Sequence, residues 1–158
     1  IDVPLAEVTA RCEAIYPGSD NEPGLRRHER LLVARDTLAR LAGMLPLAVV
    51  TGRPRRDAER FLAETGIADC FRVVVTMEDA PAKPDPAPVR VALDRLELER
   101  AWMVGDTPDD NRAARRAGVL PIGVVAPGDD PDEAKAALAS SGAGRILSTV
   151  DELLEILP

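Results

Sequence analysis

Polar side chains with complementary chemistry follow three short apolar runs in this sequence. Thr51 ends the first run, and Lys83 closely trails the second. The third run is followed by Asp106 and, one helical turn later, by Asp110. If the runs are buried parallel strands, their carboxyl ends meet at one edge of the sheet, where open α/β sheets bind their ligands. A hydroxyl, an ammonium and two carboxylates at such an edge suit phosphate-directed, metal-assisted chemistry.

The two carboxylates are the candidate metal ligands. Asp106 is expected at the carboxyl end of its strand and Asp110 in the first turn of the next helix, so that both can converge on one ion. Mg²⁺ typically takes one or two carboxylates and completes its octahedron with water and substrate phosphate. A simpler role stays open for Asp110 and its neighbour Asp109, because acidic side chains in a first turn stabilise the helix by capping or by charge.

Thr51, Gly52, Arg53 and Lys83 form the candidate phosphate-binding group. The Thr51 hydroxyl and the backbone N–H groups of the next two residues can bind a phosphate oxygen near a helix N-terminus. Lys83 lies among prolines, whose stiff backbone would aim its ammonium at a fixed point. Each residue alone has a plainer explanation, a strand end for Thr51 and a solvated surface for Lys83. Their recurrence at successive strand ends favours one shared pocket.

The composition limits the class of protein. The 158 residues allow one domain, and with 46% hydrophobic but only 3% aromatic residues its core must be built from Ala, Val, Leu and Ile. The formal net charge of -7 disfavours nucleic acid and anionic membranes as partners.

Cys12 and Cys70 have no metal-site spacing, and His28 lies in a polar stretch, so we expect reduced thiols and a solvated imidazole. Because no apolar stretch approaches a membrane span of about 20 residues and no secretion signal opens the sequence, we expect a cytoplasmic location.

Helical and strand patterns alternate along most of the chain. The predicted strands are 46–50, 72–76, 101–104, 120–125 and 145–147. The predicted helices are 4–16, 30–42, 55–65, 86–96, 109–117, 131–141 and 150–157. Alternation of this kind predicts a three-layer α/β fold, with helices covering both faces of a mainly parallel sheet. The turn-rich stretch that begins at Pro17 is the best linker candidate.

Three quoted stretches carry a resemblance to a known family. They are Val-Val-Thr-Gly-Arg-Pro-Arg at 49–55, Val-Thr-Met-Glu-Asp-Ala-Pro-Ala-Lys-Pro-Asp-Pro at 75–86 and Val-Gly-Asp-Thr-Pro-Asp-Asp at 104–110. Over about residues 29 to 157, the chain resembles the C-terminal two thirds of phosphatases of the haloacid dehalogenase superfamily, subfamily IA, and in particular the phosphoglycolate-phosphatase-like branch. Thr51 matches the second family motif, Lys83 the third, and the Asp106 and Asp110 pair the fourth.

The resemblance implies a Rossmann-like core in an incomplete form. Residues 1–17 would be the last helix of the family's helical cap, 18–28 a linker, and 29–158 the core lacking its first strand. That strand ends in an Asp-x-Asp motif in the family, and neither Asp2 nor the Glu78-Asp79 pair has the required setting or spacing. The absent strand would lie between the strands ending at Thr51 and Asp106. We therefore expect that an upstream segment or a second chain supplies it or that the strands rearrange, and that the lone chain is not an autonomous stable domain with this topology.

The implied activity is Mg²⁺-dependent hydrolysis of a small phosphorylated metabolite through an aspartyl-phosphate intermediate, with the chain itself lacking the nucleophile. Lys83 and Thr51 would neutralise and bind the transferring group, and Asp106 would hold Mg²⁺ together with the absent aspartate. Asp110 would orient Asp106, a metal-bound water or Lys83.

Two alternatives stay open, a noncatalytic relative that binds metal and partner, and a receiver-like phospho-acceptor domain. In receivers the acidic pair comes first and the lysine last, whereas here the acidic pair follows Lys83. A metal-free dehalogenase is disfavoured, because it has no use for Mg²⁺ carboxylates.

Overall fold

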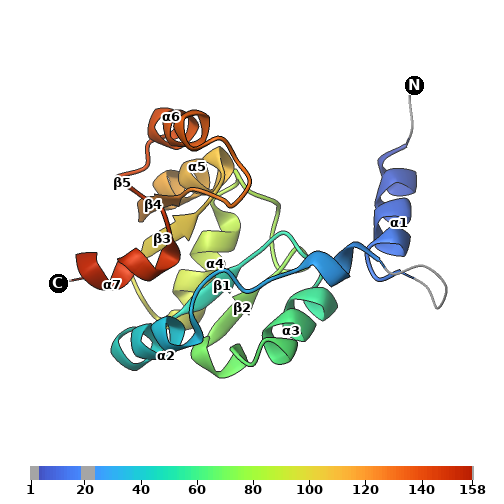
Figure 1. The fold of residues 1–158 in the computed structure, drawn as a ribbon, viewed down its shortest axis with the longest axis horizontal. Helices are drawn as coiled ribbons and strands as arrows, with labels where there is room; N and C mark the ends of the chain where they lie inside the picture. Colours follow the sequence, from blue (N-terminus) through green and yellow to red (C-terminus); the bar gives the residue numbers. More distant parts are fainter. Residues whose placement is uncertain (1–3, 19–23, 158) are drawn as a thin grey trace. The chain divides into compact units, whose positions relative to one another are not determined.

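The chain divides into two units in the computed structural model, which describes residues 4–18 and 24–157. The units are Ile1–Leu31 and Leu32–Pro158 (Figure 1). The first contains helix α1 (Leu5–Ile15) and the 3₁₀ turn η1 (Leu25–His28). The predicted linker 18–28 therefore holds a short helical turn over its last residues, while its residues 19–23 lie outside the described ranges. The assignment of residues 1–17 as a remnant of a cap stays a prediction.

The second unit contains five parallel strands in two sheets (Figure 1). One sheet pairs β1 (Ala48–Val50) with β2 (Val73–Val75). The other has the order β3-β4-β5, with bounds Trp102–Gly105, Leu120–Val124 and Arg145–Leu147. Every predicted strand is confirmed, with ends that differ by at most two residues. The single sheet expected from the alternation is instead split between β1 and β3, which do not pair with each other.

Helices connect the strands, as βαβ units require. Their bounds are α2 (Arg35–Met44), α3 (Arg55–Glu64), α4 (Ala87–Leu96), α5 (Pro108–Ala117), α6 (Pro131–Ser141) and α7 (Leu153–Ile156), with 3₁₀ turns η2 (Ala68–Cys70) and η3 (Val150–Glu152). The helix predicted over 30–42 begins only at Arg35. Its start is stabilised from far along the chain, because the Asp151 carboxylate accepts hydrogen bonds from the Ala34 N–H (3.2 Å) and the Thr37 hydroxyl.

Helices on both faces join the two sheets. Helix α4 packs on β1 and β2, α5 packs on β3 and β4, and the two helices pack on each other. Small side chains allow this close approach, in a cluster of Val89, Ala113, Ala114 and Val119. On the other face, Leu41 of α2 and Leu153 of α7 pack with strand residues, in a cluster with Ile122, Val124 and Leu147. Across the described ranges, no helix is long and apolar enough to cross a membrane.

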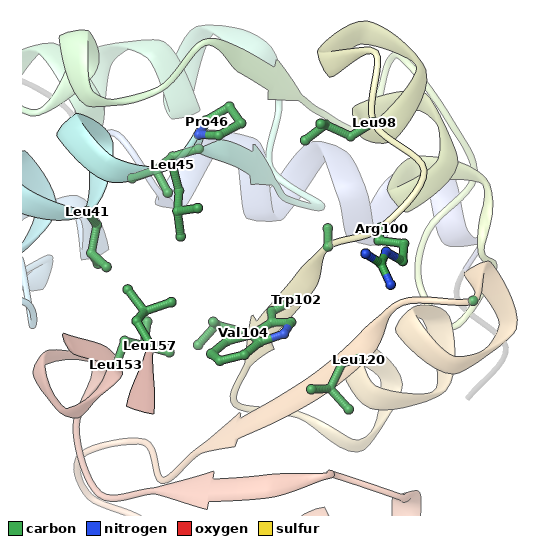
Figure 2. Close-up of a pocket in the computed structure, with 13 residues that line it drawn as sticks. Leu41, Leu45, Pro46, Leu98, Arg100, Trp102, Val104, Leu120, Leu153 and Leu157 are labelled. Atoms are coloured by element: carbon green, nitrogen blue, oxygen red, sulfur yellow. The ribbon is translucent and has the colours of Figure 1, made fainter. Parts of the chain in front are cut away.

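A cavity of about 580 Å³ opens beside β3, next to the segment Pro46 and Leu47 that leads into β1 (Figure 2). It is lined by apolar side chains from α2, β3 and the C-terminal helix, together with Arg100. Trp102 and Val104 remain 40% and 36% exposed. Strands that cross the middle of a covered parallel sheet are normally buried on both faces. The exposure of β3 therefore follows from the split between the two sheets.

Candidate functional site

An ion pair between Lys83 and Asp110 connects the two sheets at their carboxyl ends. Lys83 Nζ lies 2.6 Å from Asp110 Oδ1, and the two side chains are 22% and 6% exposed. The same Nζ donates a hydrogen bond of 3.2 Å to the carbonyl oxygen of Val50, the last residue of β1. Because Thr51 follows Val50 directly, this one ammonium group joins the predicted Thr51, Lys83 and Asp110 positions at one edge.

Asp110 is held in place by a capping box with Thr107 at the start of α5. Its Oδ2 accepts hydrogen bonds from the Thr107 N–H (3.0 Å) and hydroxyl (2.7 Å), and its own N–H donates to the Thr107 hydroxyl oxygen (3.3 Å). A Cβ at Gly105 would lie 2.3 Å from the Asp110 Cβ, so only glycine allows this approach. Asp110 thus caps the helix, which is the simpler of the two roles weighed for it, and also binds Lys83.

The Asp110 carboxyl group is poised to stay ionised. Burial raises its pKa, but the hydrogen bond and charge of Lys83 and the hydrogen bonds of Thr107 outweigh burial, so that the pKa lies below the usual aspartate value. Both carboxylate oxygens already have partners. The geometry therefore suits Asp110 to orienting Lys83, and its predicted metal ligation stays a prediction.

The surroundings of Asp106 differ from those of Asp110, whose carboxylate is buried and paired. The Asp106 side chain is exposed just beyond β3, and no hydrogen bond or ion pair involves it within the described residues. It is the carboxylate at this edge that is free to accept an external cation. Within those residues, no cluster of three or more His, Cys, Asp or Glu could hold a metal ion. This donor set fits an ion that takes few protein ligands, as Mg²⁺ does.

The predicted phosphate-binding turn lies after β1. Thr51 N–H continues the ladder to Val75 O (2.9 Å), and its hydroxyl oxygen accepts from the Arg53 N–H at 3.2 Å. The Arg53 guanidinium carbon lies 5.3 Å from the centre of the Phe61 ring. The Thr51 hydroxyl and the Arg53 N–H therefore bind each other, and Gly52 is exposed between them. Phosphate binding by this turn stays a prediction.

Asp79 is a structural residue that sequence reasoning missed. Its Oδ2 accepts from the Thr76 N–H (2.8 Å), the Thr76 hydroxyl (3.0 Å) and Arg55 (2.5 Å), and its Oδ1 accepts from Arg95 (2.7 Å). The Arg95 hydrogen bond, followed by those from Thr76, lowers the pKa of Asp79. This network ties the loop that leads to Lys83 to both α3 and α4.

The sequence carries a local signal for the missed residue Asp79 as well as for Asp110. Thr76-x-x-Asp79 and Thr107-x-x-Asp110 share the spacing of a hydroxyl and an acid that bind each other across one turn. The first follows a strand and the second precedes a helix, which makes the second a recognisable capping box. The arginine partners of Asp79 come from distant helices, so only the tertiary fold could reveal them.

Comparison with known proteins places this arrangement in a family. The family model described as haloacid dehalogenase-like hydrolase matches residues 32–124, more than half of the chain. The chain belongs to this family. The sequence prediction of that family, in its phosphoglycolate-phosphatase-like branch, is confirmed.

Individual relatives cover different shares of the chain. An imidazoleglycerol-phosphate dehydratase of Phytophthora nicotianae is 42% identical over 98% of this chain and 35% of its own length. A phosphoglycolate phosphatase of Rhodospirillum rubrum is 44% identical over 52% of this chain and 35% of its own length. A solved phosphatase of the superfamily from Thermococcus onnurineus aligns with a TM-score of 0.65 at 30% identity, over 77% of this chain and 54% of its own. The chain thus spans about a third of these curated relatives and about half of the solved one.

Proposed function

We propose that this chain carries most of the active site of a Mg²⁺-dependent phosphomonoester hydrolase. The observation that supports the proposal best is the ion pair of Lys83 with Asp110, which Lys83 also ties to the β1 carbonyl just before Thr51. Asp106 lies close in sequence, and its carboxylate has no partner among the residues that the structure describes. The substrate would be a small phosphorylated metabolite, in keeping with the acidic net charge that disfavours polyanions such as nucleic acids.

Each residue has a role that its surroundings allow. Lys83 would neutralise phosphoryl oxygens with an ammonium that Asp110 holds in a fixed direction. The Thr51 hydroxyl and the N–H groups of Gly52 and Arg53 would turn to donate to the same oxygens. Because phosphoryl transfer gains mainly from such preorganised charge and donors, these groups would stabilise the transferring phosphoryl group.

Asp106 would hold the magnesium ion. The bound ion would add positive charge beside the phosphoryl oxygens. Asp110 would act indirectly, because its two oxygens bind Lys83 and Thr107.

The nucleophile would be an aspartate from a segment that is not among the 158 residues. Its carboxylate oxygen would attack phosphorus, and the leaving oxygen would take the electron pair of the broken P–O bond together with a proton from a second aspartate of that segment and depart as an alcohol. Water would then hydrolyse the aspartyl phosphate and release phosphate. We therefore expect the chain alone to bind phosphate without turning over a substrate.

Binding of inorganic phosphate tests the site itself. With Mg²⁺ present, calorimetry should detect phosphate binding to the chain. The affinity should fall at least about tenfold in Lys83→Met. It should change little in the control Lys135→Met, which removes an exposed lysine on α6. No binding, or equal loss in both variants, would contradict the proposal.

Hydrolysis of p-nitrophenyl phosphate tests the missing nucleophile. The chain should be no faster than its Asp106→Ala variant, and a clear Mg²⁺-dependent difference between them would show that the chain is catalytic by itself. A noncatalytic binding module is the second candidate, because no described strand ends in Asp-x-Asp. Phosphate binding that persists without Mg²⁺ and without Asp106 would favour this module over the hydrolase.

A further inference from the structure

Helix α5 carries three arginines on one face, Arg112, Arg115 and Arg116. Arg115 and Arg116 follow Arg112 by three and four residues, so the three side chains leave the helix within an arc of about 100°. All three are exposed, and together with Ser141 they line a second cavity of about 380 Å³. The lining thus joins α5 to the end of α6, the helix that packs beside it (Figure 1).

This cavity is separate from the proposed active site. None of the four side chains of that site is among the described residues that line it. Arg115 and Arg116 lie about 8–9 Å farther along α5 than Asp110, at a rise of about 1.5 Å per residue. A ligand in this cavity would therefore meet a different set of side chains.

Each of the three guanidinium groups is held from one side. Arg112 pairs with Asp109 of its own helix at 2.8 Å, and Arg116 Nη1 donates to the Pro84 carbonyl at 2.9 Å. Arg115 packs against Gly142, the C-cap of α6, where a Cβ would collide with the guanidinium. These contacts position the side chains before a ligand binds, which lowers the entropic cost of binding.

Two of the three charges have no acidic partner. Asp109 compensates Arg112, but no ion pair involves Arg115 or Arg116 within the part of the chain that the structure describes. Basic residues are favoured in the last turn of a helix by its dipole. That interaction explains why arginines occur here, but it leaves most of their N–H donors without a protein acceptor. In a chain of net charge -7, this cavity is a local positive site that would attract anions.

The donors in the cavity specify the chemistry of the anion. The Ser141 hydroxyl is already engaged, because it donates to the Leu138 carbonyl and accepts from Asn111. Recognition therefore rests on the guanidinium groups, which only donate. A carboxylate has two oxygens in one plane and matches one guanidinium, whereas a phosphate group has acceptor oxygens on several sides and can contact more than one. A dianion also matches the two uncompensated charges.

We propose that this cavity is a second anion site, in which Arg115 and Arg116 bind a dianionic phosphate group. The group is either free phosphate or part of a small organic molecule, since 380 Å³ lies in the range of about 300–1,000 Å³ found for small-molecule sites. The inference goes beyond the proposed function and does not rest on it, because no residue of the active site takes part.

The side-chain N–H groups of the arginines report binding directly. We expect titration with inorganic phosphate, without Mg²⁺ and in a buffer with a stabilising osmolyte, to shift the Nε–H resonances of Arg115 and Arg116 with one common Kd. At about pH 8 the phosphate group is mostly dianionic. Sulfate should act in the same way, and chloride at equal ionic strength should cause no saturable shift.

A third titration distinguishes the two sources of the phosphate group. Tighter binding of p-nitrophenyl phosphate than of inorganic phosphate would identify an organic phosphate as the preferred ligand, and tighter binding of inorganic phosphate would identify the free ion. Either result supports a phosphate site at Arg115 and Arg116.

Single substitutions test which arginines bind. Arg115→Gln and Arg116→Gln should each weaken phosphate binding at least about fivefold, as read from the resonance of the remaining arginine. Arg40→Gln, which removes an exposed arginine of helix α2, should leave the affinity unchanged. Circular dichroism checks that each variant is folded. An equal response to chloride, or equal affinity in Arg115→Gln and the parent, would overturn the proposal.

The two phosphate sites can be tested separately. The phosphate-binding tests of the proposed function are run in Arg115→Gln, where the Lys83 site would bind alone. Calorimetric binding that disappears in Arg115→Gln would contradict only the hydrolase. Arginine resonances that do not respond to phosphate would contradict only the second site.

Discussion

Lys83 combines two interactions that a solvated lysine would not make. Its ammonium replaces part of its hydration by Asp110 Oδ1 at 2.6 Å and the Val50 carbonyl at 3.2 Å. Burying two opposite charges gains little in net stability, but removing one of them leaves the other desolvated and unpaired. The pair is therefore expected to matter more for the geometry of the pocket than for the stability of the parent chain.

Replacing Lys83 should expose this asymmetry. Lys83→Met leaves the Asp110 carboxylate buried with Thr107 as its remaining partner, which we expect to cost about 2–4 kcal/mol at neutral pH. Urea unfolding in a buffer with a stabilising osmolyte measures the cost, with Lys135→Met as the control that stays within about 0.5 kcal/mol of the parent. Similar midpoints for the two variants would show that the ion pair has no energetic role.

The loss of unfolding free energy in Lys83→Met should depend on pH, because the pKa of Asp110 is lowered in the parent chain. Because the folded pKa is below the unfolded one, the carboxylate contributes stability above about pH 3.9 that is lost as the pH falls through the folded pKa. In Lys83→Met the opposing effect of burial remains and favours the protonated acid. The difference in urea midpoint between parent and variant should therefore narrow from pH 6 to pH 3. A constant difference would mean that Asp110 does not titrate differently in the two proteins.

Helix α5 is the element that fixes the acidic end of the site. Its first turn presents Asp110, and its buried Asn111 amide donates to the Leu138 carbonyl (3.2 Å) and the Ser141 hydroxyl oxygen (2.8 Å) of α6. Asp110 thus lies in the pocket, while the next residue, Asn111, binds the neighbouring helix α6. Loosening the contact between α5 and α6 should disturb the position of Asp110.

Two neighbouring serines of α6 allow a matched test of this contact. Each hydroxyl donates to a carbonyl three residues earlier at 2.9 Å, but Ser141 is buried against Asn111 whereas Ser140 is exposed. Ser141→Ala should cost about 1–2 kcal/mol, and Ser140→Ala less than about 0.5 kcal/mol. Urea midpoints under the same osmolyte conditions provide the comparison, and equal costs would rule out a special role for the Asn111 contact.

Periodicity and turn residues predicted the elements well because they act locally. Gly118 shows this, since it directly follows the helix predicted over 109–117 and adopts φ 84° at the C-cap of α5. The start of α2 could not be predicted, because its stabilising acid is Asp151, more than a hundred residues away. The split between β1 and β3 also depends on which strands are present to pair, which no local pattern reports.

The split between the two sheets is expected to lower the stability of the whole chain. Among the strands of the described residues, none pairs with the edge of β1 that faces away from β2 or with the edge of β3 that faces away from β4. An unsatisfied buried group costs about 1–3 kcal/mol, while a whole domain is stable by only about 5–15 kcal/mol. Water that enters the open cavity reduces this cost but leaves its apolar lining wet.

We expect the isolated chain to unfold over a broad temperature range without osmolyte and to bind a dye that reports exposed apolar surface. Circular dichroism during heating and dye fluorescence measure the two properties. A monomer that unfolds in one sharp transition would contradict this expectation.

At the scale of the whole site, sequence reasoning predicted the convergence of Thr51, Lys83 and Asp110, because parallel strands bring their carboxyl ends to one edge. It left open whether Asp110 would cap its helix or orient Asp106, a metal-bound water or Lys83, since side-chain pairing depends on distances that spacing does not give. The Asp79 network was missed for the same reason.

The ion pair also has a practical consequence for labelling. The chain has two lysines, Lys83 and Lys135. Acylating reagents need an accessible amine, and the Lys83 amine is covered by Asp110 and Val50, whereas Lys135 is exposed on α6. A limiting amount of reagent should acylate the side chain of Lys135 first. A dye or a solid support can then be attached at that single side chain while the pocket keeps its ammonium.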